Sequence, residues 1–259
     1  MRIDVLLNQR NLLGESPVWD VATERLYWVD SFGQTVFRAT AKGTGCVSWQ
    51  VPKKVGSLAL MKGGGAILAL EDGFHRLDFE SGQTESLVKI ERAGEHVRLN
   101  DGKVDRDGRF IAGSMDISER TPDGVLYALE KDMRLSVLDV GLVVSNGPCW
   151  SPCGTLLYVS DSGTGHIWAY DYDRSDGSVH GKRKFASFPY QTGLPDGATV
   201  DEDGFMWSAR VFGQQICRFA PDGSIDRVIK VPVAGVTSVA FGGSDMDVLF
   251  VTSMQPPVA

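Results

Sequence analysis

Residues 104–114 read Val-Asp-Arg-Asp-Gly-Arg-Phe-Ile-Ala-Gly-Ser, and residues 200–210 read Val-Asp-Glu-Asp-Gly-Phe-Met-Trp-Ser-Ala-Arg. Both stretches lead from an apolar residue through an acidic turn that ends in glycine into a run of β-forming residues. Four other stretches have a similar form, and the six expected strands begin at residues 25, 66, 109, 156, 205 and 248. The pattern therefore recurs every 41 to 49 residues, a spacing typical of the blades of a β-propeller.

A further strand with alternating polar and apolar residues follows five of the six repeats, at 34–39, 73–78, 124–129, 166–171 and 214–219. No stretch has the periodicity of a long amphipathic helix. The sequence therefore predicts an all-β chain folded as a single six-bladed β-propeller domain over residues 1–259. An eleven-stranded can or a β-sandwich could hold as many strands, but neither predicts one pattern that recurs six times.

The last blade is expected to be incomplete at the C-terminus. The sixth repeat contains strands only at 236–241 and 248–253 before the sequence stops at Ala259. We expect residues 2–8 to supply an outer strand to this blade, because propellers often close by joining their termini. An unfilled strand position would expose unpaired backbone groups, so either the chain is clipped or its closure is unusual.

Composition excludes several classes of protein. The net charge of −7 and the lack of a long Lys/Arg run argue against a nucleic-acid or membrane-surface partner. No window is apolar enough to span a membrane, and the N-terminus lacks the features of a secretory signal, so we expect a cytoplasmic protein. The four cysteines are expected to be buried free thiols, because no second Cys pair or neighbouring His completes a zinc site.

Oxygen-bearing side chains occupy one phase of the repeat, four residues before a first-strand Val or Trp. They are Glu15, Asn100, Asn146 and Asp196, and the other two blades have Gly56 or Ser57, and Thr237 or Ser238. First strands line the channel of a propeller, so these side chains should converge at one mouth. Carboxylates and carboxamides without sulfur or imidazole favour a hard divalent cation. Turn formation would explain each residue singly, but it explains neither the shared phase nor the presence of Glu15.

The strings around these positions resemble a known family. They are Leu-Gly-Glu15-Ser-Pro-Val-Trp, Arg98-Leu-Asn100-Asp-Gly-Lys, Ser-Asn146-Gly-Pro and Leu-Pro-Asp196-Gly. The chain resembles the gluconolactonase, regucalcin (senescence marker protein) and luciferin-regenerating enzyme family from about residue 10 to residue 254. This resemblance implies a six-bladed propeller with one divalent cation on its axis. Calcium is the first choice for that cation, with zinc, manganese, magnesium or iron as alternatives.

The resemblance also assigns roles to individual residues. It implies Glu15, Asn146 and Asp196 as the metal ligands, and Arg98 and Asn100 as substrate-binding residues. The match weakens after Met115, where relatives place a further substrate-binding acid. In this sequence that residue is predicted to be Asp116, with Glu119 as the alternative. Lys103 is expected to be solvated.

The leading functional prediction is a metal-dependent lactonase that opens a gluconolactone-like or pentonolactone-like sugar-acid lactone to the aldonic acid. The metal would polarise the carbonyl, and Asp196 would be the catalytic residue that assists the attack of water. The expected partner is a small-molecule lactone, and the expected state is a monomer or a weak homo-oligomer. Two alternatives stay open: a calcium-binding regulatory protein without turnover, and an ester or phosphotriester hydrolase on the same scaffold. A WD-repeat platform is disfavoured, because no Gly-His…Trp-Asp signature recurs.

Overall fold

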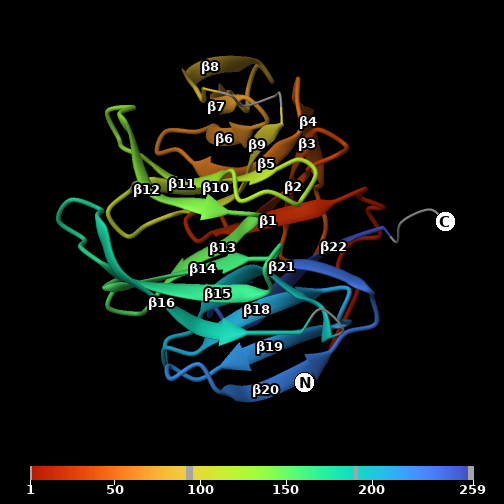
Figure 1. Ribbon diagram of the computed structural model, residues 1–259. Helices are drawn as coiled ribbons and strands as arrows, with labels where there is room; N and C mark the ends of the chain where they lie inside the picture. The colour runs from red at the N-terminus through yellow and green to blue at the C-terminus, as the bar shows by residue number, and fades with distance from the viewer. Residues whose placement is uncertain (1, 92–95, 190–191, 256–259) are drawn as a thin grey trace.

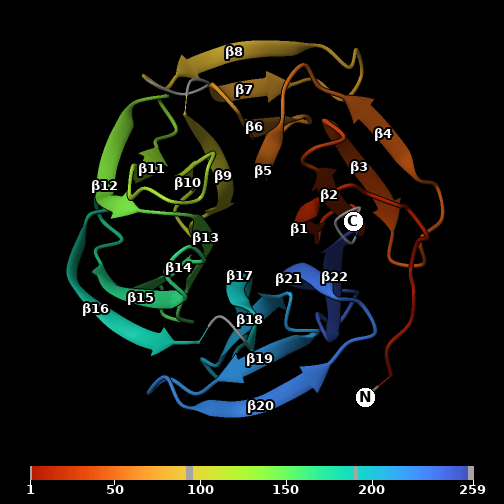
Figure 2. The same ribbon diagram turned by 45° about the vertical axis from the view of Figure 1, so that its right-hand side comes forward.

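The computed structural model describes residues 2–91, 96–189 and 192–255, which form 22 strands and no helical element. The strands make antiparallel sheets arranged in a ring, with the first strand of each sheet nearest the centre (Figures 1 and 2). The all-β propeller predicted from the repeat is therefore confirmed. None of the described residues forms a helix long and apolar enough to cross a membrane.

Five sheets have four strands each, hydrogen-bonded in chain order. Blade one contains β1 (Gly14–Asp20), β2 (Arg25–Asp30), β3 (Thr35–Thr40) and β4 (Val47–Gln50). Blade two contains β5 (Val55–Leu60), β6 (Ala66–Leu70), β7 (Gly73–Leu77) and β8 (Thr84–Lys89). Blade three contains β9 (Val97–Val104), β10 (Phe110–Asp116), β11 (Gly124–Leu129) and β12 (Leu135–Leu142). Blade four contains β13 (Ser145–Trp150), β14 (Leu156–Asp161), β15 (His166–Tyr172) and β16 (Val179–Ser187). Blade five contains β17 (Leu194–Val200), β18 (Met206–Val211), β19 (Gln215–Phe219) and β20 (Ile225–Lys230).

The sector between blades five and one holds a sheet of only two strands, β21 (Gly235–Gly242) and β22 (Val248–Met254). The prediction of six blades is therefore wrong in its number of complete blades, which is five among the described residues. The prediction that the last sheet is incomplete is confirmed. The outer edge of β22 pairs with no other described strand, and Val248 and Val251 are 43% and 42% exposed.

The N-terminal residues do not complete this sheet. The prediction of an outer strand at residues 2–8 is wrong, because this segment forms no strand. An outer strand needs a third strand with which to pair, and beside β22 the described residues supply only the contacts of Leu12 and Leu13 at its C-terminal end. The ring closes instead by an isolated bridge between Leu13 and Met254 and by a 3.3 Å hydrogen bond from Gln255 N to Leu12 O.

The acidic turns that define the repeat are held by their own side chains. Asp105 Oδ1 accepts hydrogen bonds from Asp107 N at 2.9 Å and Arg109 N at 2.7 Å. The glycines that end the two quoted turns, Gly108 and Gly204, have left-handed φ values of +90° and +86°. Residues other than glycine rarely adopt this backbone conformation. The acid and the glycine therefore specify the turn together.

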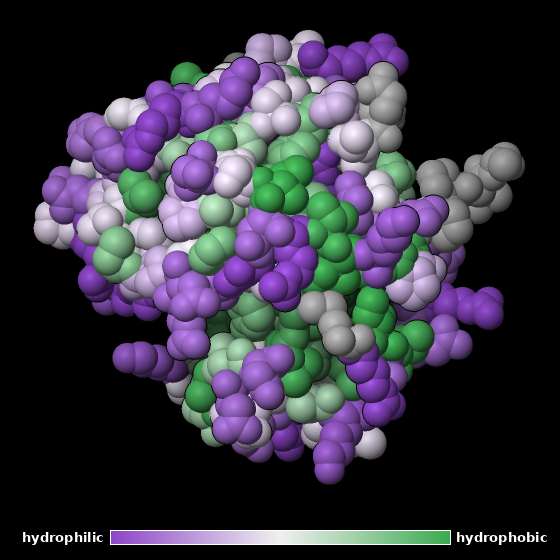
Figure 3. Space-filling view, turned by 90° about the horizontal axis from the view of Figure 1, so that it is seen from below, coloured by the Kyte–Doolittle hydropathy of each residue, from purple (hydrophilic) through white to green (hydrophobic). Residues whose placement is uncertain are grey.

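Apolar clusters fill the space between neighbouring sheets. Each of the six sheet–sheet boundaries contains one such cluster of buried side chains. Trp19 stacks on Phe250, and Trp150 packs edge-on against Tyr172. The face seen from below in Figure 1 also exposes apolar side chains between polar ones (Figure 3).

All four cysteines are free thiols. Cys149 and Cys217 are buried as predicted, but the prediction of burial is wrong for Cys46 and Cys153, which are exposed.

Neighbouring sheets are also joined by polar hooks at the end where each first strand begins. In each hook a side chain on one sheet bonds to the backbone of the next. The hooks are Thr237 Oγ1 to Gly14 O, Leu58 N to Ser16 Oγ, Ser57 Oγ to Asn100 O, Asn100 Nδ2 to Ser145 O, and Ser162 Oγ to Pro195 O. We call this end of the ring the hooked mouth.

Candidate metal and substrate site

The predicted ligands lie on the innermost strands at the hooked mouth. Glu15, Asn100, Asn146 and Asp196 belong to β1, β9, β13 and β17. Each lies where the register between the first and second strands of its blade shifts, and the other two sheets have the same shift. Such a bulge turns a side chain away from the ordinary alternation of a strand. The recurring phase in the sequence therefore corresponds to a bulge in every sheet.

A chain of hydrogen bonds runs along this mouth from blade three to blade five. Arg98 Nη1 donates to Asn100 Oδ1 at 2.8 Å, and Asn100 Nδ2 donates to Asn146 Oδ1 at 2.9 Å. Asn146 Nδ2 then donates to Ser162 Oγ at 2.8 Å, and that hydroxyl donates to Pro195 O at 2.6 Å. Since a guanidinium can only donate, it fixes the orientation of both amides. This series of hydrogen bonds ends at Pro195 O, one residue before Asp196.

Three buried carboxylates lie beside this chain. Glu15, Asp101 and Asp196 are 8%, 4% and 6% exposed. Burial raises the pKa of Glu15 well above its ordinary value, and the charges of Asp196 and Asp101 raise it further. Burial likewise raises the pKa of Asp196, with the charge of Asp101 as the next cause. Burial also raises the pKa of Asp101. Buried like charges destabilise one another unless a cation or a proton compensates them.

This donor set fits a hard divalent cation, because Glu15, Asp196 and Asn146 offer only oxygen. Within the described ranges, no group of three or more His, Cys, Asp and Glu side chains is placed to hold a metal ion. The third predicted ligand is an amide, which lies outside that set of residue types. Asn100 Oδ1 accepts from Arg98, and Asn100 Nδ2 donates to Asn146 Oδ1. Asn100 therefore contacts the predicted ligand Asn146.

Arg98 contributes a positively charged side chain to the hooked mouth. Its side chain is buried, and Arg98 Nη1 also donates to Leu99 O at 3.0 Å. Burial lowers its pKa, whereas the nearby charges of Glu119, Glu71 and Glu15 raise it. A guanidinium held among carboxylates is well placed to bind hydroxyl groups of a polar ligand.

The two acids predicted after Met115 differ in their surroundings. Asp116 Oδ2 accepts from Ser118 Oγ at 2.5 Å and from the backbone N–H groups of Arg120 and Thr121, both at 2.9 Å. These bonds lower its pKa well below the ordinary value, with Ser118 as the largest cause, and they occupy the carboxylate within its own loop. Glu119 is exposed, has a left-handed φ of +57°, and acts electrostatically on Arg98 and Asp196. Glu119 therefore has the surroundings expected of a substrate-binding acid, whereas Asp116 has those of a loop-holding residue.

Two residues near the candidate site, Ser162 and Lys103, were missed or misread. Ser162 directly follows Asp161, as Ser31 follows Asp30 in blade one, and this repeated pair was a signal in the sequence. The expectation that Lys103 is solvated is wrong, because Lys103 Nζ donates to Ala198 O at 2.7 Å.

A separate open depression of about 590 Å³ lies on blade four, lined by Thr155, Leu156, Asp171, Tyr172, Asp173, Arg174 and His180. It contains none of the predicted site residues. The depression is therefore separate from the candidate site on the first strands.

Comparison with known proteins identifies the family. Residues 13–255 match the SMP-30/Gluconolactonase/LRE-like region. The chain belongs to this family. It is 35% identical to the 6-deoxy-6-sulfogluconolactonase of Pseudomonas putida, over 96% of this chain and 86% of that protein. The structure of a luciferin-regenerating enzyme aligns with a TM-score of 0.89 and 32% identity, over 95% of this chain and 85% of that one. The structure of a calcium-binding protein, regucalcin, from Agrobacterium tumefaciens aligns with a TM-score of 0.93 and 25% identity, over 98% and 86%.

Proposed function

We propose that this protein is a divalent-cation-dependent hydrolase that opens a sugar-acid lactone to the aldonic acid at the hooked mouth. The observation that carries the proposal is the chain from Arg98 through Asn100 to Asn146, next to the buried carboxylates of Glu15 and Asp196. It combines groups that bind hydroxyls with oxygen donors suited to a cation. Membership of a family whose members include a sulfogluconolactonase supports lactones as the substrate class.

Glu15, Asn146 and Asp196 would hold the cation. When bound, it would balance the buried carboxylates and polarise the lactone carbonyl, stabilising negative charge on that oxygen. Ser162 and Asn100 hold the amide of Asn146 in place, and its oxygen, which accepts from Asn100, would use its second lone pair for the cation. Calcium is the first candidate, because the related regucalcin structure is that of a calcium-binding protein.

The remaining residues would bind the sugar and move the proton. Arg98 and Glu119 would bind hydroxyl groups from two sides, one as a donor and one as an acceptor. Asp196 would accept a proton from water as the water oxygen bonds to the carbonyl carbon. The ring C–O bond then breaks, and the ring oxygen takes up a proton to become the hydroxyl of the aldonic acid.

A pH-stat assay on metal-stripped protein tests this function. Calcium, zinc, manganese and magnesium are each added with glucono-, galactono-, xylono- and 6-deoxy-6-sulfogluconolactone. We expect cation-dependent acid release that falls at least ~100-fold in Asp196→Asn and shows a raised KM in Arg98→Ala. Asp203→Asn is the matched control, because this carboxylate on the same blade is 72% exposed. Acid release that needs no cation, or that survives in Asp196→Asn, contradicts the proposal.

A calcium-binding protein without turnover is the second candidate, supported by the similarity to the regucalcin structure. It predicts that calcium binds to the wild-type protein in titration calorimetry while no lactone is hydrolysed. An aryl ester and a phosphotriester in the same assay test the remaining alternative, a different hydrolase on this scaffold.

A further inference from the structure

Two side chains that follow Asn100 on β9 reach the strands that carry two of the proposed ligands. Asp101 Oδ2 accepts a hydrogen bond from Gly147 N at 2.9 Å, directly after Asn146. Lys103 Nζ donates to Ala198 O at 2.7 Å, two residues after Asp196. Asp101 thus contacts blade four, and Lys103 reaches past it to blade five.

The strands of blades four and five are in close contact at the ligand positions. Gly147 has a left-handed φ of +53°, and a Cβ atom there would lie 2.6 Å from Asp196 O and 3.0 Å from Ala198 N. The turn after Asn146 therefore packs directly on the backbone of Asp196. Gly147 N, the amide of this tight contact, donates to the carboxylate of Asp101.

The bond made by Lys103 joins blades that are not neighbours in the ring. Residues 103 and 198 belong to blades three and five, with blade four between them. A lysine ammonium is strongly hydrated, and fixing it on one carbonyl costs solvation and side-chain entropy. The positive charge of Lys103 lies near the buried Asp101, which compensates part of this cost.

We infer that Asp101 and Lys103 are positioning residues that set the distance between the ligand-bearing strands of Asn146 and Asp196, and so determine the affinity for a divalent cation. The inference rests on the proposed cation site but not on lactone turnover. The two oxygens of Asp101 accept from the amides of Gly102 and Gly147, and Lys103 is itself a cation, so the inference assigns neither residue as a ligand. Asp101 also adds negative charge beside Glu15 and Asp196. Residues that orient metal ligands typically change metal affinity by 10- to 100-fold when they are replaced.

Lys103→Met separates positioning from simple electrostatics, because the two predict opposite signs. Removing a positive charge near a cation site should tighten cation binding by Coulomb's law. Loss of the bond to Ala198 O should instead loosen the strand of Asp196 and weaken binding. We expect the calcium Kd of Lys103→Met to rise about tenfold, which corresponds to about 1.4 kcal/mol. Lys103→Gln loses the charge but keeps an N–H donor, so it should bind calcium more tightly than Lys103→Met.

Titration calorimetry with calcium alone measures these affinities on the full chain, and thermal unfolding verifies that each variant is folded. Lys182→Met is the matched control, since it removes a lysine that bonds Asp139 Oδ2 at 2.5 Å between blades three and four, outside the ligand strands. We expect it to alter stability without altering the calcium Kd. Unchanged or tighter calcium binding in Lys103→Met overturns the inference while the cation site stands. If the wild-type protein binds no divalent cation, both the inference and the cation-dependent function are overturned.

Discussion

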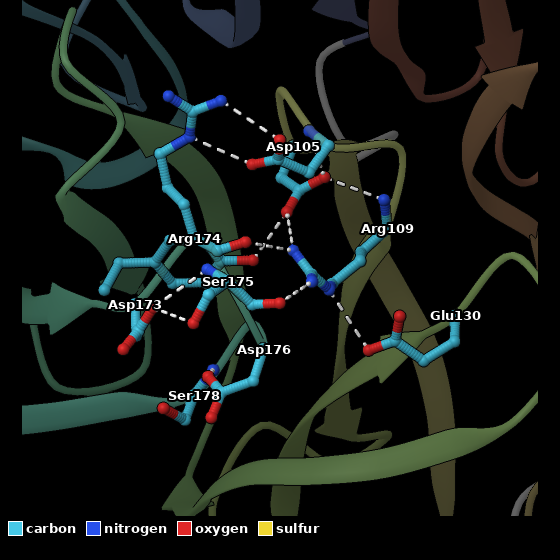
Figure 4. A network of polar contacts seen from close by, with 10 residues as sticks. Asp105, Arg109, Glu130, Asp173, Arg174, Ser175, Asp176 and Ser178 are labelled. Carbon is cyan, nitrogen blue, oxygen red and sulfur yellow. Dashed lines mark hydrogen bonds and ion pairs between the residues drawn. The ribbon is translucent and has the colours of Figure 1, made fainter.

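Arg109→Met should lower the stability of the propeller by an amount set by the charge it leaves behind. Arg109 lies in the turn between β9 and β10, where its guanidinium bonds Asp105 Oδ2 at 3.1 Å and Glu130 Oε1 at 3.2 Å. It also donates to the carbonyl oxygens of Arg174 and Ser175 on blade four, at 3.0 and 3.1 Å (Figure 4). One side chain therefore ties blade three to blade four at the end of the blades away from Glu119.

The magnitude follows from burial. The side chains of Arg109 and Asp105 are 10% and 1% exposed. Methionine replaces the aliphatic stem of arginine but leaves the Asp105 carboxylate without its cation. Removing one member of a buried ion pair costs roughly 3–5 kcal/mol. Asp105 keeps three other donors, namely two backbone N–H groups and Tyr172 OH at 2.7 Å. We therefore expect the lower end, about 3 kcal/mol, or a fall in Tm of roughly 6–12 °C for a chain of this size.

Urea unfolding monitored by tryptophan fluorescence measures this loss. Arg134→Met is the control, because Arg134 pairs with Asp132 on the surface, where the side chains are 77% and 59% exposed; its free energy of unfolding should stay unchanged within error. The double variant Asp105→Asn/Arg109→Met should recover part of the loss, since it removes the orphaned charge. A loss below about 1 kcal/mol in Arg109→Met, or no recovery in the double variant, would refute this reasoning.

Two further outcomes follow from the structure. The pKa of the Cys153 thiol is lowered to about 7 by hydrogen bonds from two neighbouring hydroxyls. Its thiolate fraction should rise as the pH passes through about 7, so the rate with Ellman's reagent should be half-maximal there; a midpoint above about 8 would show that the hydroxyls do not stabilise the thiolate. Ser162→Ala removes the group that accepts from Asn146 and donates to Pro195 O. Its calcium Kd should rise about tenfold, and an unchanged Kd in calorimetry would remove Ser162 from the proposed site.

Most strand positions could be predicted from the sequence because the repeat encodes them twice, in turn chemistry and in alternation. The strands expected at 25–30, 124–129 and 156–161 coincide with β2, β11 and β14. The outer strand at residues 2–8 could not be predicted correctly, since β pairing depends on a partner edge elsewhere in the chain. Local alternation contains no information about whether that edge exists.

The sequence predicted which strands carry the residues of the candidate site, but not which contacts their side chains make. The phase shared by Glu15, Asn146 and Asp196 located the mouth, because a bulge recurs in every sheet. Asp116 was favoured by its position after Met115, yet its oxygens bond its own loop, a choice decided by the conformation of residues 117–121. The target of Lys103 depends on the distance across the ring, which no local pattern encodes.

Some contacts that join neighbouring sheets also build the candidate site. The hooks at the mouth add polar contacts to the apolar clusters that join neighbouring sheets. Asn100 is both a hook to Ser145 O and the link between Arg98 and Asn146. These hooks hold the backbone of the first strands next to the proposed ligands, as a cation with strict distance requirements needs. In the proposed function Asn100 contributes to stability and to ligand geometry together, whereas Arg98, the buried donor at the start of this series of hydrogen bonds, contributes mainly to recognition.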